Sequence, residues 1–221
     1  MKKIKAVIFD MDGVIFDTEC LWKEYFVLAN KEFNANISEE YRQSICGKSE
    51  EAIRNELKEL YPELDADEYR EFMLKGVRQA ISEGCFETKD GFETIVAFLK
   101  EKGCGLALAT SSRRARAESM FEKKGYRKEN IFDVFVFGDD VGTRCKPDPY
   151  VFEIAAERLG VSHDECMVLE DSLNGIKAAA EGGFVAVMVK DLIPPDDYCK
   201  RRCSLIADSF MDVKKYLENI I

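Results

Sequence analysis

Four groups of polar residues follow short apolar runs of the chain, and together their side chains could carry out one kind of chemistry. Hydroxyl and backbone N–H groups suit phosphate oxygens, a lysine neutralises phosphate, and carboxylates are the ligands that Mg²⁺ prefers. Phosphoryl transfer needs this combination, because its catalysis is mostly positioning and neutralisation of charge. The four groups are Asp10-Met11-Asp12-Gly13, Thr110-Ser111-Ser112, Lys146-Pro147-Asp148 and Glu170-Asp171-Ser172.

The first group contains the predicted nucleophile and the predicted acid–base residue. An aspartate has a reference pKa of about 3.9, so Asp10 could attack phosphorus without a histidine to activate it. Asp12 lies two residues further on and points to the same face if the backbone stays extended. It could therefore protonate the leaving group in a first step and activate water in a second. We also expect the backbone N–H groups at Ser111 to bind phosphate oxygens.

The residues before each group predict the elements that position it. The five apolar runs are continuous and not alternating, which is typical of strands covered on both faces of a parallel sheet. Helical stretches separate them, so we expect a parallel α/β sheet with ligands at the carboxyl ends of the strands. The predicted strands are Lys5–Asp10, Gly105–Thr110, Val134–Gly138, Cys166–Glu170 and Phe184–Val189. The predicted helices are Gly91–Lys102, Arg113–Lys124, Asp148–Leu159 and Leu173–Glu181.

The first gap between strands differs from the others. About ninety residues without a strand pattern separate the first two runs, which is more than one crossover helix fills. We predict an all-helical cap domain inserted at residues 17–86, leaving 1–16 and 87–221 as the catalytic core. Aromatic and apolar residues at helical spacing from Trp22 onward predict the packed face of its first helix. Two further helices are expected at Glu50–Leu60 and Ala66–Ser82.

Composition limits the class of partner. The 221 residues carry a formal net charge of −10, which disfavours a nucleic-acid surface, and we expect a small phosphorylated metabolite as the ligand. No apolar run approaches the roughly 20 residues that span a bilayer. The apolar run after the basic N-terminus stops at Asp10, so we expect no export and a cytoplasmic protein. We also expect a monomer.

The eight cysteines form no CxxC pair, which predicts reduced thiols. Cys199 and Cys203 flank Lys200-Arg201-Arg202 and receive no role, because the chain has a single histidine, His163, to complete a zinc site. The same scarcity of histidine argues against a Ser-His or Cys-His hydrolase.

In this order, DMDGV, TSS, KPDP and EDS resemble the four core motifs of the haloacid dehalogenase superfamily. The segments KPDPYVF and EDSLNGIKAAAEGG resemble its subgroup of β-phosphoglucomutases and sugar-phosphate phosphatases. The resemblance implies a doubly wound, Rossmann-like α/β core, a helical cap over the active site and a Mg²⁺ cofactor. By position it implies a nucleophile at Asp10, an acid–base residue with its backbone carbonyl on Mg²⁺ at Asp12, phosphate ligands at Thr110 and Lys146, and metal ligands at Asp171 and, in second rank, Glu170.

The resemblance leaves the phosphoryl acceptor open between water and a sugar. A mutase holds a bisphosphorylated sugar and needs cap cations for the second phosphate, but Trp22, Cys46 and Glu50 stand where the mutase pattern has histidine, lysine and arginine. We therefore prefer a phosphatase, with β-phosphoglucomutase as the alternative. Candidate cap contacts to the substrate are Trp22, Gly47, Lys48 and Ser49.

Other branches of the superfamily and other classes of protein are less favoured. The dehalogenase branch lacks an equivalent of Asp12, and the setting of Lys48 does not match the Schiff-base lysine of the phosphonate-cleaving branch. A receiver domain also phosphorylates an aspartate, but that aspartate ends a middle strand and no cap intervenes. A retired binding protein is disfavoured because every motif position is intact.

Overall fold

The computed structural model describes residues 3–45 and 50–221, which divide into two compact units. Met1–Asp17 with Glu87–Ile221 form the first unit, called the core below, and Thr18–Phe86 form the second, called the cap. The cap thus begins one residue later than the start at residue 17 that the sequence predicts. The two chain crossings between the units form a short antiparallel ribbon of β2 (Phe16–Asp17) and β3 (Glu87–Thr88).

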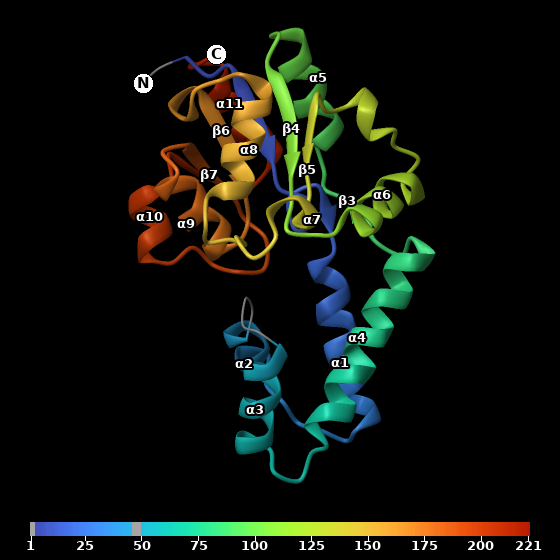
Figure 1. Cartoon of the computed structure of the whole chain (residues 1–221). Helices are drawn as coiled ribbons and strands as arrows, with labels where there is room; N and C mark the ends of the chain where they lie inside the picture. Colours follow the sequence, from blue (N-terminus) through green and yellow to red (C-terminus); the bar gives the residue numbers. More distant parts are fainter. Residues whose placement is uncertain (1–2, 46–49) are drawn as a thin grey trace. The chain divides into compact units, whose positions relative to one another are not determined.

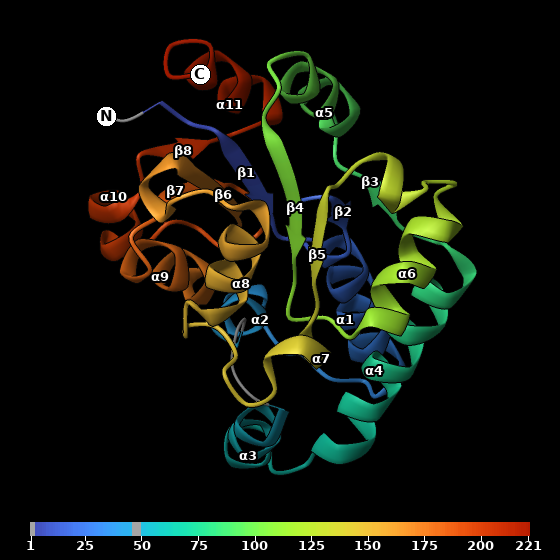
Figure 2. The same cartoon turned by 45° about the horizontal axis from the view of Figure 1, so that its top comes forward.

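The core contains a parallel sheet, which confirms the predicted fold class. Among the described residues the sheet has six strands in the order β5-β4-β1-β6-β7-β8, with β1 in the middle (Figure 1; β1 and β8 are labelled in Figure 2). The strands are β1 (Ala6–Phe9), β4 (Gly105–Ala109), β5 (Val134–Val136), β6 (Cys166–Glu170), β7 (Val185–Val189) and β8 (Leu205–Ala207).

Helices cover both faces of this sheet, as the continuous apolar strands predict. Successive residues of β1 point to opposite faces: Ile8 belongs to a buried cluster with Phe152 of α8, while the Phe9 ring contacts Phe92 of α5 and Phe210 of α11. Figure 2 shows α8 and α9 side by side, and α5 beside α11. The helices are α5 (Phe92–Glu101), α6 (Arg114–Lys123), α7 (Gly138–Val141), α8 (Tyr150–Leu159), α9 (Leu173–Glu181), α10 (Asp197–Arg202) and α11 (Phe210–Leu217), with 3₁₀ turns at Lys128–Asn130 and His163–Glu165.

The third strand is shorter than predicted. β5 ends at Val136, and Gly138 opens the short helix α7 instead of extending the strand. A Cβ atom at Gly138 would lie 2.3 Å from the carbonyl oxygen of Ser111 in the loop after β4. Glycine at this turn therefore allows the two loops to approach closely.

The cap is built from helices, as predicted, and has its own apolar cluster. Phe26 and Ala29 of α1 are buried, while Trp22 and Phe33 pack against the same cluster. The helices are α1 (Glu19–Glu32), α2 (Glu39–Ser44), α3 (Glu50–Leu60) and α4 (Ala66–Glu83). The described helices include none that is long and apolar enough to cross a bilayer.

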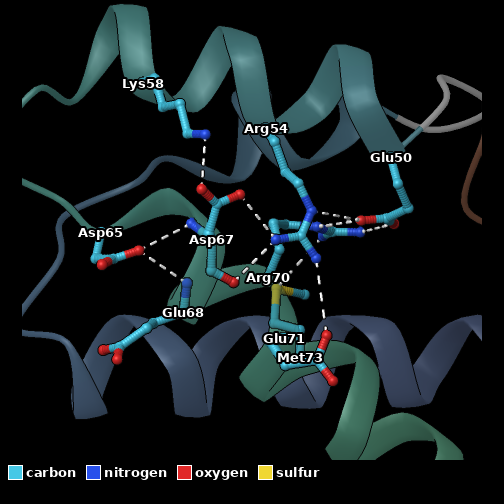
Figure 3. A network of polar contacts seen from close by, with 9 residues as sticks. All are labelled: Glu50, Arg54, Lys58, Asp65, Asp67, Glu68, Arg70, Glu71 and Met73. Carbon is cyan, nitrogen blue, oxygen red and sulfur yellow. Dashed lines mark hydrogen bonds and ion pairs between the residues drawn. The ribbon is translucent and has the colours of Figure 1, made fainter.

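Ion pairs tie α3 to α4 at the surface of the cap (Figure 3). Arg54 and Lys58 of α3 pair with Asp67 of α4 at 3.0 and 2.6 Å, and Glu50 of α3 pairs with Arg70 of α4. Asp65 caps α4, because its side chain accepts hydrogen bonds from the backbone N–H groups of Asp67 and Glu68.

Candidate active site

The carboxyl ends of the two strands beside β1 bring the predicted motifs together. Residues of β1 pair with β4 on one side and β6 on the other, with Phe9 level with Leu108 and Leu169. Asp10 continues this register, since its backbone N–H donates to the carbonyl of Leu169 at 3.0 Å. The polar residues that follow these neighbouring parallel strands therefore lie close together at the same edge of the sheet.

Lys146 joins the ends of β1 and β6 inside the protein. Its Nζ donates to Asp10 Oδ1 at 2.5 Å and to Glu170 Oε1 at 2.7 Å. The three side chains are only 7%, 8% and 2% exposed. A buried lysine between two carboxylates is a costly arrangement for stability alone, which makes this cluster a candidate for function.

The electrostatics of the cluster favour further positive charge. Burial raises the pKa of Asp10 to about 7, opposed by Lys146 and reinforced by the charges of Glu170 and Asp12. Burial alone would lower the pKa of Lys146, but Asp10 and Glu170 outweigh it, so the net pKa is raised and the lysine stays charged. One ammonium group therefore faces an excess of buried carboxylates.

Asp171, the residue after β6, adds a third carboxylate to those of Asp10 and Glu170. Oxygen atoms of Asp10, Glu170 and Asp171 lie within 4.8 Å of one another, and all three residues are buried. Asp171 fits against Gly13, which has φ +74° and where a Cβ atom would lie 2.2 Å from Asp171 Oδ2. Only glycine suits that position, since both the backbone angle and the close approach exclude a side chain. The three carboxylates are the donor set that a hard divalent cation takes.

Glu170 is held in place on both of its oxygen atoms. Besides Lys146 on Oε1, the backbone N–H of Ser172 donates to Oε2 at 2.6 Å. A Cβ atom at Gly175 in α9 would lie 1.8 Å from Oε1. The missing side chain of Gly175 therefore makes room for the Glu170 carboxylate.

Gly175→Ala is therefore expected to displace Glu170 and to disturb the Lys146 pair. We expect a loss of about 100-fold in kcat, the scale attributed to small misplacements in active sites, with the variant still folded. Steady-state turnover and circular dichroism would measure this. Gly105→Ala is the matched control, because its added Cβ would meet mainly Leu159 Cδ2 at 3.2 Å, far along the strand from the cluster. Normal turnover in folded Gly175→Ala would contradict this role.

The loop after β4 places Thr110 beside the first strand. Thr110 is buried, its N–H donates to the carbonyl of Val136, and its Oγ1 accepts from the N–H of Ser112 at 3.1 Å. Ser111 is exposed at the end of this strand. Thr110, Ser111 and Lys146 thus lie on the loops that surround Asp10, as the sequence predicts for phosphate ligands; their roles stay predictions.

Asp12 has a partner that the sequence reasoning missed. Arg116 of α6 donates from both terminal nitrogens to the two oxygens of Asp12, at 2.6 and 2.8 Å, and Ser112 Oγ donates to Asp12 Oδ2 at 2.9 Å. The available signal was the run of arginines at 113, 114 and 116 in the first turn of a helix, where the helix dipole disfavours positive charge. An arginine at such a position indicates an acidic partner.

Of the four predicted cap contacts, the structure describes only Trp22. Gly47, Lys48 and Ser49 lie outside the described residues. Trp22 packs against the apolar cluster of the cap, and the guanidinium carbon of Arg70 lies 5.6 Å from the centre of its ring. Substrate contact through these four residues stays a prediction.

Cys199 and Cys203 are free thiols at the two ends of one turn of chain. Burial raises the pKa of Cys199 to about 12 and that of Cys203 to about 11. Thiols with such pKa values are poor nucleophiles at neutral pH.

Comparison with known proteins agrees with this geometry. The model of the haloacid dehalogenase-like hydrolases matches residues 4–183. A protein of Thermotoga maritima named phosphorylated carbohydrates phosphatase is 33% identical over 184 residues, which cover 82% of each chain. Protein CbbY of Cereibacter sphaeroides is 30% identical over 95% of this chain and 92% of its own length.

A solved structure shows the same fold. The crystal structure of a haloacid dehalogenase family hydrolase from Deinococcus radiodurans, with bound phosphate and sodium, superposes with a TM-score of 0.86. It covers 100% of this chain and 97% of the other at 20% identity. At that identity the likeness shows the fold alone.

Proposed function

Because the chain belongs to the haloacid dehalogenase-like hydrolase family, we propose that it is a Mg²⁺-dependent phosphatase acting on a small phosphorylated metabolite. Sugar phosphates are the proposed substrate class, and the reaction passes through an aspartyl phosphate on Asp10. The observation that carries this proposal is the buried cluster in which Lys146 bridges Asp10 and Glu170 beside Asp171. The Thermotoga relative, named for phosphorylated carbohydrates, supports the substrate class.

The chain's own residues supply both steps. In the first, Asp10 Oδ attacks phosphorus, the bond to the leaving group breaks, and Asp12 gives its proton to the leaving oxygen. In the second, water attacks the aspartyl phosphate, its proton passes to Asp12, and the electron pair of the broken bond returns to Asp10. Lys146, Thr110 and the backbone N–H groups at Ser111 hold and neutralise the phosphate oxygens.

The donor set fits a divalent cation. Asp10, Glu170 and Asp171 provide three buried carboxylates against one ammonium group, and Gly13 leaves room for Asp171. These residues, with the backbone carbonyl of Asp12, would hold Mg²⁺. When bound, the cation supplies neutralisation of charge that develops on the transferred phosphoryl group.

The two buried arginines of the cap support water over a sugar as the acceptor. A mutase needs cap cations that are available for a second phosphate. Arg70 is 4% exposed, and its Nε and Nη2 donate to Glu50 at 3.2 and 2.5 Å (Figure 3). Arg42 is likewise buried and makes a double hydrogen bond to Glu39. Both buried arginines of the described cap residues are thus neutralised within the cap.

A phosphate-release screen over sugar phosphates and other metabolites with Mg²⁺ tests the proposal. A coupled assay of β-glucose 1-phosphate conversion with a bisphosphate primer should be run beside it. We expect many turnovers of phosphate for at least one sugar phosphate and little glucose 6-phosphate. Robust glucose 6-phosphate formation would establish the mutase alternative, and release that stops at one equivalent would favour a receiver-like phosphoacceptor.

Removal of the metal should stop the reaction. With EDTA in excess, phosphate release is expected to fall to background and to return on addition of Mg²⁺, while Ca²⁺ restores it poorly because its larger, looser coordination spoils the in-line geometry. The measurement is the initial rate of phosphate release in each metal. Full activity in chelator would refute the metal assignment.

A further inference from the structure

Asp12 and Arg116 form a bidentate ion pair at the edge of the active site. Both carboxylate oxygens of Asp12 accept from the guanidinium group, at 2.6 and 2.8 Å, and Ser112 Oγ makes a third hydrogen bond at 2.9 Å. Arg116 also donates to Ser112 Oγ, so the three side chains close a ring of contacts. A planar guanidinium group that holds both oxygens fixes the plane as well as the position of a carboxylate.

The placement of Arg116 is specific to this contact. Arg114, on the same first turn of α6, is half exposed and reaches Glu118 and Asp140 only at 3.8 and 3.7 Å, with its guanidinium over the ring of Phe137. Arg116 is more enclosed and aims at one acidic group of another segment, 104 residues away in sequence. A positive charge in the first turn of a helix is unfavourable without such a partner.

We propose that Arg116 is a positioning residue that fixes Asp12 for the second, hydrolytic step of the reaction. The inference rests on the proposed function, in which Asp12 activates the water. In that step a bond forms between the water oxygen and phosphorus, the bond between phosphorus and Asp10 breaks, and the proton of water goes to Asp12. The base must then be a carboxylate held in a defined orientation, which is what the hydrogen bonds from Arg116 and Ser112 impose.

The first step makes a different demand. With p-nitrophenyl phosphate the leaving group departs without a proton, so formation of the aspartyl phosphate does not need Asp12. Loss of Arg116 should consequently slow breakdown of the intermediate and spare its formation. A purely structural role for Arg116 would impair both steps together.

Pre-steady-state hydrolysis of p-nitrophenyl phosphate with Mg²⁺ tests this in wild type, Arg116→Ala, Arg116→Lys and Arg114→Ala. We expect Arg116→Ala to show a stoichiometric burst of nitrophenolate, to accumulate phosphorylated enzyme by mass spectrometry, and to lose about 10-fold to 100-fold in kcat, at or below the contribution of a general base itself. Guanidinium ion should partly rescue it. The kcat of Arg116→Lys should lie between those of Arg116→Ala and wild type, and the kcat of Arg114→Ala should match that of wild type.

Other outcomes separate this inference from the function on which it rests. A parallel fall of burst and steady-state rates in folded Arg116→Ala, with no phosphorylated enzyme, would overturn the positioning role. Unchanged turnover in Arg116→Ala would overturn it too, while leaving the phosphatase proposal intact. Absence of phosphate release by wild type over the whole substrate screen would instead refute the proposed function.

Discussion

Asp10→Asn is expected to abolish phosphate release while the variant stays folded. An amide is isosteric with the carboxylate but cannot form the aspartyl phosphate, so the covalent route is closed. Removal of a nucleophile in other hydrolases costs several orders of magnitude, and we expect a loss of at least about 10,000-fold in kcat. Phosphate release by the purified variant and mass spectrometry of the intact protein would measure turnover and the missing phosphoryl group.

A second buried aspartate of the core provides the control. Asp191 also has its pKa raised by burial and also pairs with a lysine, Lys89, at 2.7 Å, but it follows β7 and not β1. Asp191→Asn should have a stability similar to that of Asp10→Asn and should keep the turnover of wild type. Appreciable turnover in Asp10→Asn, or an equal loss in Asp191→Asn, would contradict covalent catalysis by Asp10.

Most of the sheet could be predicted from the sequence because its central strands are buried on both faces. Runs such as AVIF and CMVLE have no alternation, and the structure places both in the middle of the sheet. The edge strand β8 (Leu205–Ala207) was missed, together with α10 and α11. Only Ala207 of its three residues is fully buried, while Leu205 and Ile206 are partly exposed, so this short run gives no clear apolar signal.

The positions of the site residues could be predicted for a related reason. Parallel strands end at the same edge, so the residue after each strand is placed by topology without knowledge of side-chain contacts. Arg116 and Gly175 lie within helices, and their roles depend on which way one turn of α6 or α9 faces a neighbouring loop. Distances of that kind come from tertiary packing, which periodicity does not encode.

Lys146→Met should produce the second large effect, on activity and on stability together. Methionine keeps the length of the side chain but removes the charge between Asp10 and Glu170, which are both almost fully buried. Breaking a buried ion pair costs about 3–5 kcal/mol, and we expect a loss of this size in the free energy of unfolding in the presence of chelator. Turnover should fall to background, because phosphate also loses its cation.

Magnesium and pH distinguish this electrostatic account from simple loss of packing. A divalent cation on the same carboxylates should restore part of the stability of Lys146→Met. The variant should also be more destabilised at about pH 8 than at about pH 5, where protonation discharges Asp10, whose pKa burial raises to about 7. Urea denaturation with and without Mg²⁺ at both pH values measures this. Lys89→Met, which breaks the Asp191 pair, should show no Mg²⁺ effect beyond that of wild type. A loss in Lys146→Met that is indifferent to both Mg²⁺ and pH would mean that the lysine serves packing and not charge.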